Sequence, residues 1–115
     1  MPFISVHTNA KLSEAQKENF KSAIGEAVSL IPGKREELLM LEIEDEKTMY
    51  FKGKSDGIYA AVTVNCYKNA PFEDNRNFTR RVYEILEQQW NIADDHAYVI
   101  IIEVPTWGTR GDLKQ

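Results

Sequence analysis

Residues 98–104 read Tyr-Val-Ile-Ile-Ile-Glu-Val, an almost continuously apolar run that stops before Pro105. Its length and its β-branched side chains predict a strand. Both sides of that strand are apolar: Val99 and Ile101 occupy one side, and the other side carries Tyr98, Ile100, Ile102 and Val104. Strands with this composition are usually buried on both faces. We therefore expect a sheet whose two faces are both covered.

The residues before this run predict a helix and, further back, another strand. Asp74 and Asn75 are candidates for the helix cap, and apolar side chains then recur at helical spacing at Phe78, Val82, Ile85, Leu86 and Trp90. The segment 68–73 contains Pro71 and is expected to be a loop. Residues 58–67 are rich in Ala, Val and Thr, which favours a strand. The second half of the chain therefore predicts a strand, a helix and a strand.

The first half of the chain predicts the same three elements. Residues 2–8 have strand character, and residues 13–16 (Ser-Glu-Ala-Gln) form a capping box that begins a helix. That helix ends at Pro32-Gly33, and its apolar stripe is formed by Phe20, Ala23, Ile24, Ala27, Val28 and Ile31. The next strand shows alternation, with apolar side chains at Leu39, Leu41 and Ile43.

An offset of 58 positions relates the two halves and takes Val6 to Val64 and Leu41 to Val99 without a gap. We predict one domain over residues 1–115, of the α+β class, built from two pseudo-symmetric β-α-β units. Each unit pairs two parallel strands through a right-handed crossover. Two helices cover only one face of the resulting four-stranded sheet. We therefore expect another subunit to cover the second face.

The composition excludes several classes of protein. Hydrophobic residues make up 43% and charged residues 28% of the chain, as in ordinary globular proteins. The formal net charge is −4, and the sequence lacks the basic excess that nucleic-acid-binding proteins usually carry on one face, so we expect no nucleic-acid partner. No stretch has transmembrane length and no signal peptide is apparent, so we expect no membrane partner and a cytoplasmic location. Cys66 is the only cysteine, and His7 and His96 lack metal-ligand spacing, so neither an internal disulfide nor a metal site is expected.

Pro2 directly follows the initiator methionine. A small second residue normally allows Met1 to be removed, which leaves a secondary amine as the first atom of the chain. An α-amino group titrates near about pH 8, and burial against apolar side chains lowers its pKa. Such an amine is a neutral base near cellular pH, where general acid–base catalysis is most efficient. Many chains begin Met-Pro without any role for the proline, so this feature alone leaves both interpretations open.

Several motifs together resemble the macrophage migration inhibitory factor and D-dopachrome tautomerase family of the tautomerase superfamily. They are the opening MPFISVHTN over residues 1–9, Gly33-Lys34 after the first helix, the segment 75–79 (Asn-Arg-Asn-Phe-Thr), and Ala97-Tyr98-Val99. The likeness spans essentially the full chain. It implies a homotrimer of β-α-β units and a keto–enol tautomerase, an isomerase that needs no cofactor. The implied test substrates are phenylpyruvate-type 2-oxo acids, their enols and dopachrome-type compounds.

The resemblance also implies roles for single residues. Pro2 is the catalytic base that moves a proton between the α-carbon and the oxygen of the substrate. Lys34 holds the substrate carboxylate by a charge-assisted contact and lowers the pKa of the amine. The other implied substrate-binding residues are Asn65, Cys66 through its backbone N–H, Tyr98 from the adjacent subunit, and Trp107 at the rim. Without the resemblance, Lys34 could also be a solvated surface lysine. Tyr98 could be an aromatic residue of a strand, and Cys66 a small buried hydrophobic residue.

Two positions depart from the mammalian members of the family. Ile100 replaces a pocket asparagine, and Leu38 replaces a tyrosine or arginine near the mouth. The pocket is therefore expected to be more apolar, with a weaker preference for hydroxyphenylpyruvate over phenylpyruvate. The family's paired cysteines correspond to Ile58 and Ala61, so thiol–disulfide activity is not implied.

Two other functions stay open at the level of the sequence. One is a cytokine-like binding protein that engages a receptor through the trimer surface and has only vestigial tautomerase activity. The other is a small ligand-sensing domain with a split βαβ arrangement, which needs no free N-terminus. The mammalian members of the family also lack a secretion signal. The absence of such a signal is therefore compatible with non-classical release and does not decide between these functions.

Overall fold

The computed structural model describes residues 1–115. Along the chain, strands, α-helices and short 3-10 helices (η) follow in the order β1 (Pro2–Thr8), α1 (Glu14–Ala27), η1 (Val28–Leu30), η2 (Glu36–Leu38), β2 (Met40–Glu44), β3 (Ala60–Tyr67), α2 (Phe72–Trp90), η3 (Asp94–His96), β4 (Ala97–Val104), β5 (Trp107–Thr109) and β6 (Asp112–Lys114). The two predicted strand-helix-strand units are therefore present, and a short hairpin of β5 and β6 follows them.

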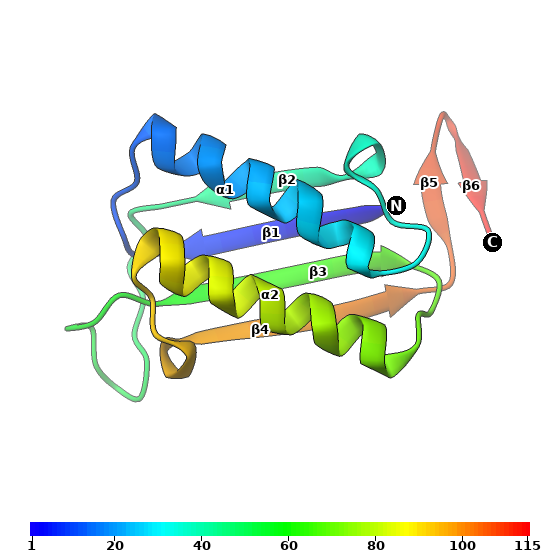
Figure 1. The fold of residues 1–115 in the computed structure, drawn as a ribbon. Helices are drawn as coiled ribbons and strands as arrows, with labels where there is room; N and C mark the ends of the chain where they lie inside the picture. Colours follow the sequence, from blue (N-terminus) through cyan, green and yellow to red (C-terminus); the bar gives the residue numbers. More distant parts are fainter.

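One mixed sheet in the order β2-β1-β3-β4 forms the first layer of the fold. Within each unit the two strands are parallel: β1 pairs with β2, and β3 pairs with β4. The two units meet where β1 and β3 run antiparallel. Both helices lie on the same face of this sheet, as Figure 1 shows. The predicted two-layer architecture is confirmed.

The internal symmetry extends to the element boundaries. An offset of 58 takes the first residue of β1, Pro2, to Ala60, the first residue of β3. The same offset takes Glu14, where α1 begins, to Phe72, where α2 begins. The sequence likeness between the two halves therefore corresponds to a structural repeat.

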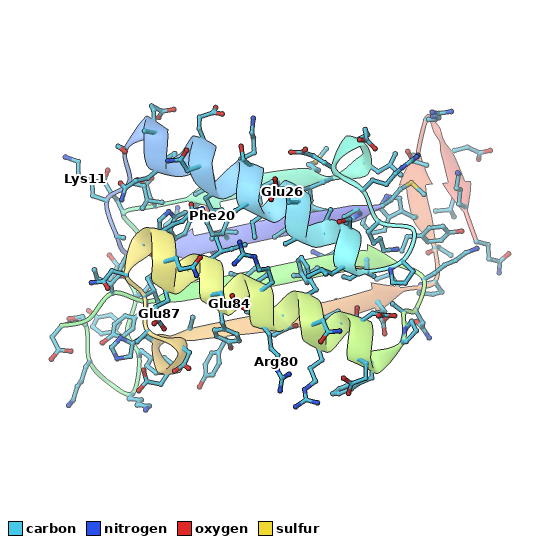
Figure 2. The ribbon with its side chains drawn as sticks, in the orientation of Figure 1. Lys11, Phe20, Glu26, Arg80, Glu84 and Glu87 are labelled. Carbon is cyan, nitrogen blue, oxygen red and sulfur yellow. The ribbon has the colours of Figure 1, made fainter.

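The core fills the space between the helices and the sheet. Alternate residues of β1 and β3 point into it, so that Ile4, Val6, Val62 and Val64 are fully buried. The ring of Phe20 in α1 stacks on Trp90 in α2, with ring centroids 4.0 Å apart. Figure 2 shows Phe20 on the side of α1 that is turned toward α2. The apolar stripes of both helices predicted from the sequence are core, and Trp90 is part of it.

The two helices begin in different ways. The Gln16 N–H donates to Ser13 Oγ at 3.1 Å, and the Ser13 N–H donates to Gln16 Oε1 at 2.8 Å, which confirms the predicted capping box. The cap predicted for α2 is wrong, since that helix begins at Phe72 after Pro71. Pro71, with φ of −56°, presets the entry of the chain without a side-chain cap.

No side chain caps α2, and the carboxylate of Glu103 in β4 holds the start of this helix in place. It accepts hydrogen bonds from the Ala70 N–H at 2.7 Å and from the Asn75 amide at 3.2 Å. The two side chains expected to cap the helix, Asp74 and Asn75, therefore lie in its first turn. An acidic residue there interacts favourably with the helix dipole.

The side chain of Asn9 explains why β3 begins at Ala60 and not at Ile58. Its amide donates to the Gly57 carbonyl at 2.8 Å, and its Oδ1 accepts from the Tyr59 N–H at 2.8 Å. These bonds replace the strand pairing that Tyr59 would otherwise make. The long connection after β2 is thereby held against the end of β1.

The second face of the sheet carries exposed apolar side chains. Met40 on β2 is 67% exposed, and on β4 the exposed fractions are 62% for Tyr98, 49% for Ile100 and 42% for Ile102. We call this surface the open face. Within one chain nothing covers it.

No helix has both the length and the apolar character that a membrane crossing requires.

Candidate active site

The pairing of β1 with β3 brings three of the predicted site residues together. Pro2 lies opposite Cys66, and Phe3 lies opposite Asn65. The Asn65 amide also reaches across to the Phe3 carbonyl at 3.4 Å. Pro2 itself is buried, while Met1 is half-buried in front of it. The N-terminus is therefore fixed as a strand in the centre of the sheet, with Asn65 and Cys66 beside it.

Lys34 reaches the same place from the end of the first helix. Gly33 has φ of +80°, a left-handed conformation that glycine adopts without strain, and the chain turns there toward the N-terminus. The Lys34 Nζ donates to the Tyr67 carbonyl at 2.7 Å. The Tyr67 N–H in turn donates to the Met1 carbonyl at 3.3 Å. A lysine distant in sequence thus places its ammonium group beside the start of the chain.

Burial and neighbouring charges lower the pKa of the terminal amine. In this structure the amine belongs to Met1, and its pKa lies below the ordinary value. Burial is the main cause, because it disfavours the ammonium form. The positive charge of Lys34 is the next cause and acts in the same direction, while Cys66 opposes it. This corner of the fold therefore favours a neutral amine.

A groove of about 500 Å³ opens beside Pro2. Its walls come from the start of β1, from the segment 37–40 and from β5. Trp107 and Leu38 both line it, which places two residues expected near the rim in contact with the same space as Pro2. Met40 and Phe3 add further apolar surface. The groove is of a size and character that suit a small, partly apolar molecule.

Cys66 is 2% exposed and is the only cysteine of the chain. Burial raises the pKa of its thiol, although the charges of Lys34 and of the terminal amine counteract this in part. A thiol of this kind stays protonated and is a poor nucleophile. Cys66 therefore contributes backbone and small apolar volume to the site, with no thiolate chemistry.

Tyr98 lies apart from the groove. It pairs with Ala61 in β3, whereas Pro2 pairs with Cys66, five residues further along the same strand. At about 3.3 Å per residue this separation is roughly 16 Å. At its own end of the sheet Tyr98 packs against Phe51, with ring centroids 5.3 Å apart. Ile100 lies on the open face with Tyr98 and pairs with Thr63, also away from Cys66. Within one chain, neither Tyr98 nor Ile100 therefore reaches Pro2.

The residues of this region that were not identified from the sequence include Tyr67, Glu37 and Met40. Tyr67 links Met1 to Lys34 through its backbone, and Glu37 and Met40 line the groove. Tyr67 ends the strand that pairs with Pro2, but no pattern of residue types marks it, because it acts through its backbone. The other two depend on the path of the segment between α1 and β2, which no periodicity specifies.

No group of three or more His, Cys, Asp or Glu side chains is arranged to hold a metal ion.

Comparison with known proteins identifies the family. The sequence model described as macrophage migration inhibitory factor (MIF) matches residues 1–111. The chain belongs to this family. A comparison with curated proteins found no match.

Solved structures show the same fold at low sequence identity. MIF2 from Leishmania major is 21% identical with a TM-score of 0.90, over 99% of this chain and 97% of that one. The MIF-like protein from Entamoeba histolytica is 17% identical with a TM-score of 0.86, over 98% of both chains. A third structure is that of Pt0534 inactivated by 2-oxo-3-pentynoate, 12% identical with a TM-score of 0.86, over 95% of this chain and 93% of that one.

Proposed function

We propose that this protein is a keto–enol tautomerase that uses the N-terminal amine of Pro2 as its general acid and base. The observation that supports this most directly is the buried start of β1, where Pro2 lines an apolar groove and the Lys34 ammonium is close enough to the terminal amine to lower its pKa. The mechanism requires that Met1 be removed. The burial and the lysine charge that lower the pKa of the amine on Met1 then act on the secondary amine of Pro2.

The proposed substrates are 2-oxo acids of the phenylpyruvate type. Lys34 would hold the carboxylate, and Asn65 and the backbone N–H of Cys66 would contact the polar end of the molecule. The aromatic ring would lie against Trp107 and Leu38 in the groove. The amine of Pro2 then removes a proton from the carbon next to the carbonyl group and delivers a proton to the carbonyl oxygen, which gives the enol. In the reverse direction it takes the proton from the enol oxygen and returns one to the carbon. Positioning in a water-poor groove supplies much of the rate.

Tyr98 enters this proposal through a second copy of the chain. Since it lies roughly 16 Å along the sheet from Pro2, it cannot contact a substrate at Pro2 of its own chain. It is exposed on the open face, whose apolar side chains need a cover. We propose a homotrimer in which the open faces are buried and Tyr98 completes the groove of a neighbouring subunit. Each site then consists of residues from two chains.

The third structural relative supports the class of substrate. It was inactivated by 2-oxo-3-pentynoate, a 2-oxo carboxylate, and it shares the fold of this chain. A groove that combines an amine with a neighbouring cation is suited to such a molecule, because the cation attracts the carboxylate while the amine acts at the adjacent carbons. The same argument favours 2-oxo acids over neutral carbonyl compounds for this protein.

The test is a Pro2→Gly variant, with Met1 removal established by intact-mass spectrometry in both proteins. We expect the rate of phenylpyruvate enolisation to fall by at least about 10²-fold, the lower end of what general acid–base groups contribute. The sedimentation of the variant should equal that of the wild type. An unchanged rate in fully processed protein would remove Pro2 from the mechanism.

A cytokine-like binding protein with vestigial tautomerase activity is the alternative that the family fold also allows. The two proposals differ in their dependence on Pro2. If a receptor binds the protein with the same affinity before and after the Pro2→Gly change, and the wild type enolises phenylpyruvate no faster than buffer does, the binding function is favoured.

A further inference from the structure

Tyr67, the last residue of β3, connects three parts of the molecule at the N-terminal corner. Its N–H donates to the Met1 carbonyl at 3.3 Å, and its carbonyl accepts from Lys34 Nζ at 2.7 Å. Its hydroxyl donates to the main-chain oxygen of Gln115 at 2.8 Å, which holds the residue that follows β6 against Tyr67. Figure 1 shows the N-terminus next to the hairpin of β5 and β6. The C-terminal residues therefore belong to the surroundings of the groove.

Three lysines gather around Tyr67, although the chain as a whole carries a net charge of −4. Lys34 binds its carbonyl, and the Lys68 Nζ lies 5.1 Å from the centre of its ring. Lys114 directly precedes the tethered Gln115. None of the three lysines forms a salt bridge. The corner therefore holds three ammonium groups that have no carboxylate partner.

The nearby carboxylates have other partners. Glu37, which lines the groove, forms a salt bridge with Arg35 at 3.5 Å. Glu103 accepts hydrogen bonds from the start of α2, at 2.7 and 3.2 Å. Asp112 accepts from the Leu113 N–H of its own hairpin at 2.8 Å. None of these carboxylates pairs with Lys34, Lys68 or Lys114, so the three ammonium groups can still contact an anion from solution.

Lys114 is placed beside the groove by the pairing of the hairpin. It lies directly opposite Trp107 in the β5–β6 pair, and residues directly opposite in an antiparallel pair project to the same side. Trp107 lines the groove, so Lys114 lies next to one of its walls without being part of the lining. The charge of Lys114 also contributes to the lowered pKa of the terminal amine, which agrees with its position near that amine.

We propose that Lys114 binds a second anionic group of the substrate, so that the groove accepts 2-oxo acids with two carboxylates. This inference rests on the proposed function, in which Lys34 binds the first carboxylate. The second carboxylate meets Lys114 at the C-terminal edge of the groove. Because Lys114 is exposed, its contribution is that of a surface ion pair, which corresponds to at most about fivefold in affinity.

The experiment compares Lys114→Gln with wild type on two substrates: oxaloacetate, which has two carboxylates, and phenylpyruvate, which has one. We expect kcat/KM for oxaloacetate to fall about fivefold and that for phenylpyruvate to change by less than about twofold. High salt should abolish the difference for oxaloacetate, because exposed charges are screened. Lys11→Gln is the matched control, since Lys11 is exposed, forms no salt bridge and lies at the opposite end of the molecule (Figure 2).

Other outcomes overturn the assignment of Lys114. Equal losses on both substrates would mean that it acts through the amine, and no loss would mean that it contacts no substrate. A selective loss with Lys68→Gln and none with Lys114→Gln would transfer the role to Lys68. If the wild type enolises neither compound, the proposed function fails. Binding of oxaloacetate, measured by NMR titration, then decides the inference by itself: about fivefold weaker binding to Lys114→Gln supports it, and equal affinity overturns it.

Discussion

Lys34 combines two effects on the proposed reaction, and one substitution separates them. In Lys34→Ala the carboxylate loses its cation, so we expect the KM for phenylpyruvate to rise about tenfold or more, as for loss of a hydrogen bond to a charged group. The amine loses a neighbouring positive charge that lowers its pKa. Its pKa therefore rises, and a larger fraction of the base is protonated at neutral pH.

The pH profile of kcat/KM reports this second effect. The amine must be unprotonated to accept a proton, so the rate rises with pH through the amine's pKa. In the wild type the inflection should lie below the value of about 8 for a free α-amino group. In Lys34→Ala it should move to higher pH. Lys21→Ala, an exposed position on α1, serves as the control, and identical profiles with identical KM values would reject the role of Lys34.

At the level of single residues, the sequence predicted some neighbours of Pro2 better than others. Asn65, Cys66 and Lys34 were placed by the family motifs, and the strand register and the turn at Gly33 bring them to the N-terminus. Trp107 was also placed near the groove that it lines. Tyr67 was missed because its contribution comes from backbone atoms and from a hydroxyl bonded to Gln115, and neither shows in a pattern of residue types.

Among the elements, the start of α1 depends on a side chain from a distant segment. Asp45 follows β2, and its Oδ2 accepts from the Leu12 N–H at 3.0 Å, just before the helix cap. Its Oδ1 lies 3.6 Å from the Lys17 ammonium. The hydrogen bond, followed by the lysine, holds the pKa of this carboxyl below its usual range. The ionised form of Asp45 therefore joins the loop after β2 to the helix.

This arrangement predicts a pH-dependent stability. A carboxyl whose pKa is lowered by folding stabilises the protein above its unfolded pKa, and the contribution is lost as the pH falls through the folded pKa. Asp45→Asn should therefore be less stable than wild type at neutral pH, and the difference should shrink toward acidic pH. Urea unfolding at a series of pH values measures it. Asp94→Asn, an exposed position without such partners, should show no such trend.

The elements themselves were predicted well where periodicity and capping agree. The capping box of Ser13 marks the start of α1 correctly, since it is a local signal. The predicted stop at Pro32-Gly33 lies too far along the chain, because α1 ends at Ala27 and the 3-10 helix η1 (Val28–Leu30) follows it. The other boundaries that differed depend on distant partners. Glu103 accepts hydrogen bonds at the start of α2. The Asn9 side chain forms hydrogen bonds with the Gly57 carbonyl and the Tyr59 N–H, just before β3. Such contacts exist only in the folded chain, so a local reading of the sequence could not include them.

For the whole molecule, the internal repeat explains why the open face exists. Each β-α-β unit supplies one helix, and right-handed crossovers in two units related by antiparallel β1 and β3 place both helices on one face. In β4, the strand whose sequence indicated two covered faces, Val99 and Ile101 are half-buried and pack against the core. Tyr98, Ile100 and Ile102 on the other side remain exposed in a single chain. The sequence thus predicted a cover for this face, and the proposed trimer would supply it.

Ile102→Glu tests that assembly. The side chain lies on the open face and is 42% exposed in one chain, so a charge there would be tolerated by the single chain but would be costly to bury against another subunit. We expect analytical ultracentrifugation to show trimers for the wild type and a shift toward single chains for the variant. Phenylpyruvate activity should fall with the fraction of trimer, because Tyr98 then no longer reaches a neighbouring groove.

Phe72→Glu provides the matched control for this loss of assembly. Phe72 is 76% exposed and begins α2 on the helix side of the molecule, away from the open face. The same change of charge there should leave both the sedimentation and the activity of the wild type intact. If the wild type sediments as single chains at every concentration yet enolises phenylpyruvate, the groove of one chain is sufficient. Tyr98 would then have no part in the reaction, and its packing against Phe51 would be purely structural.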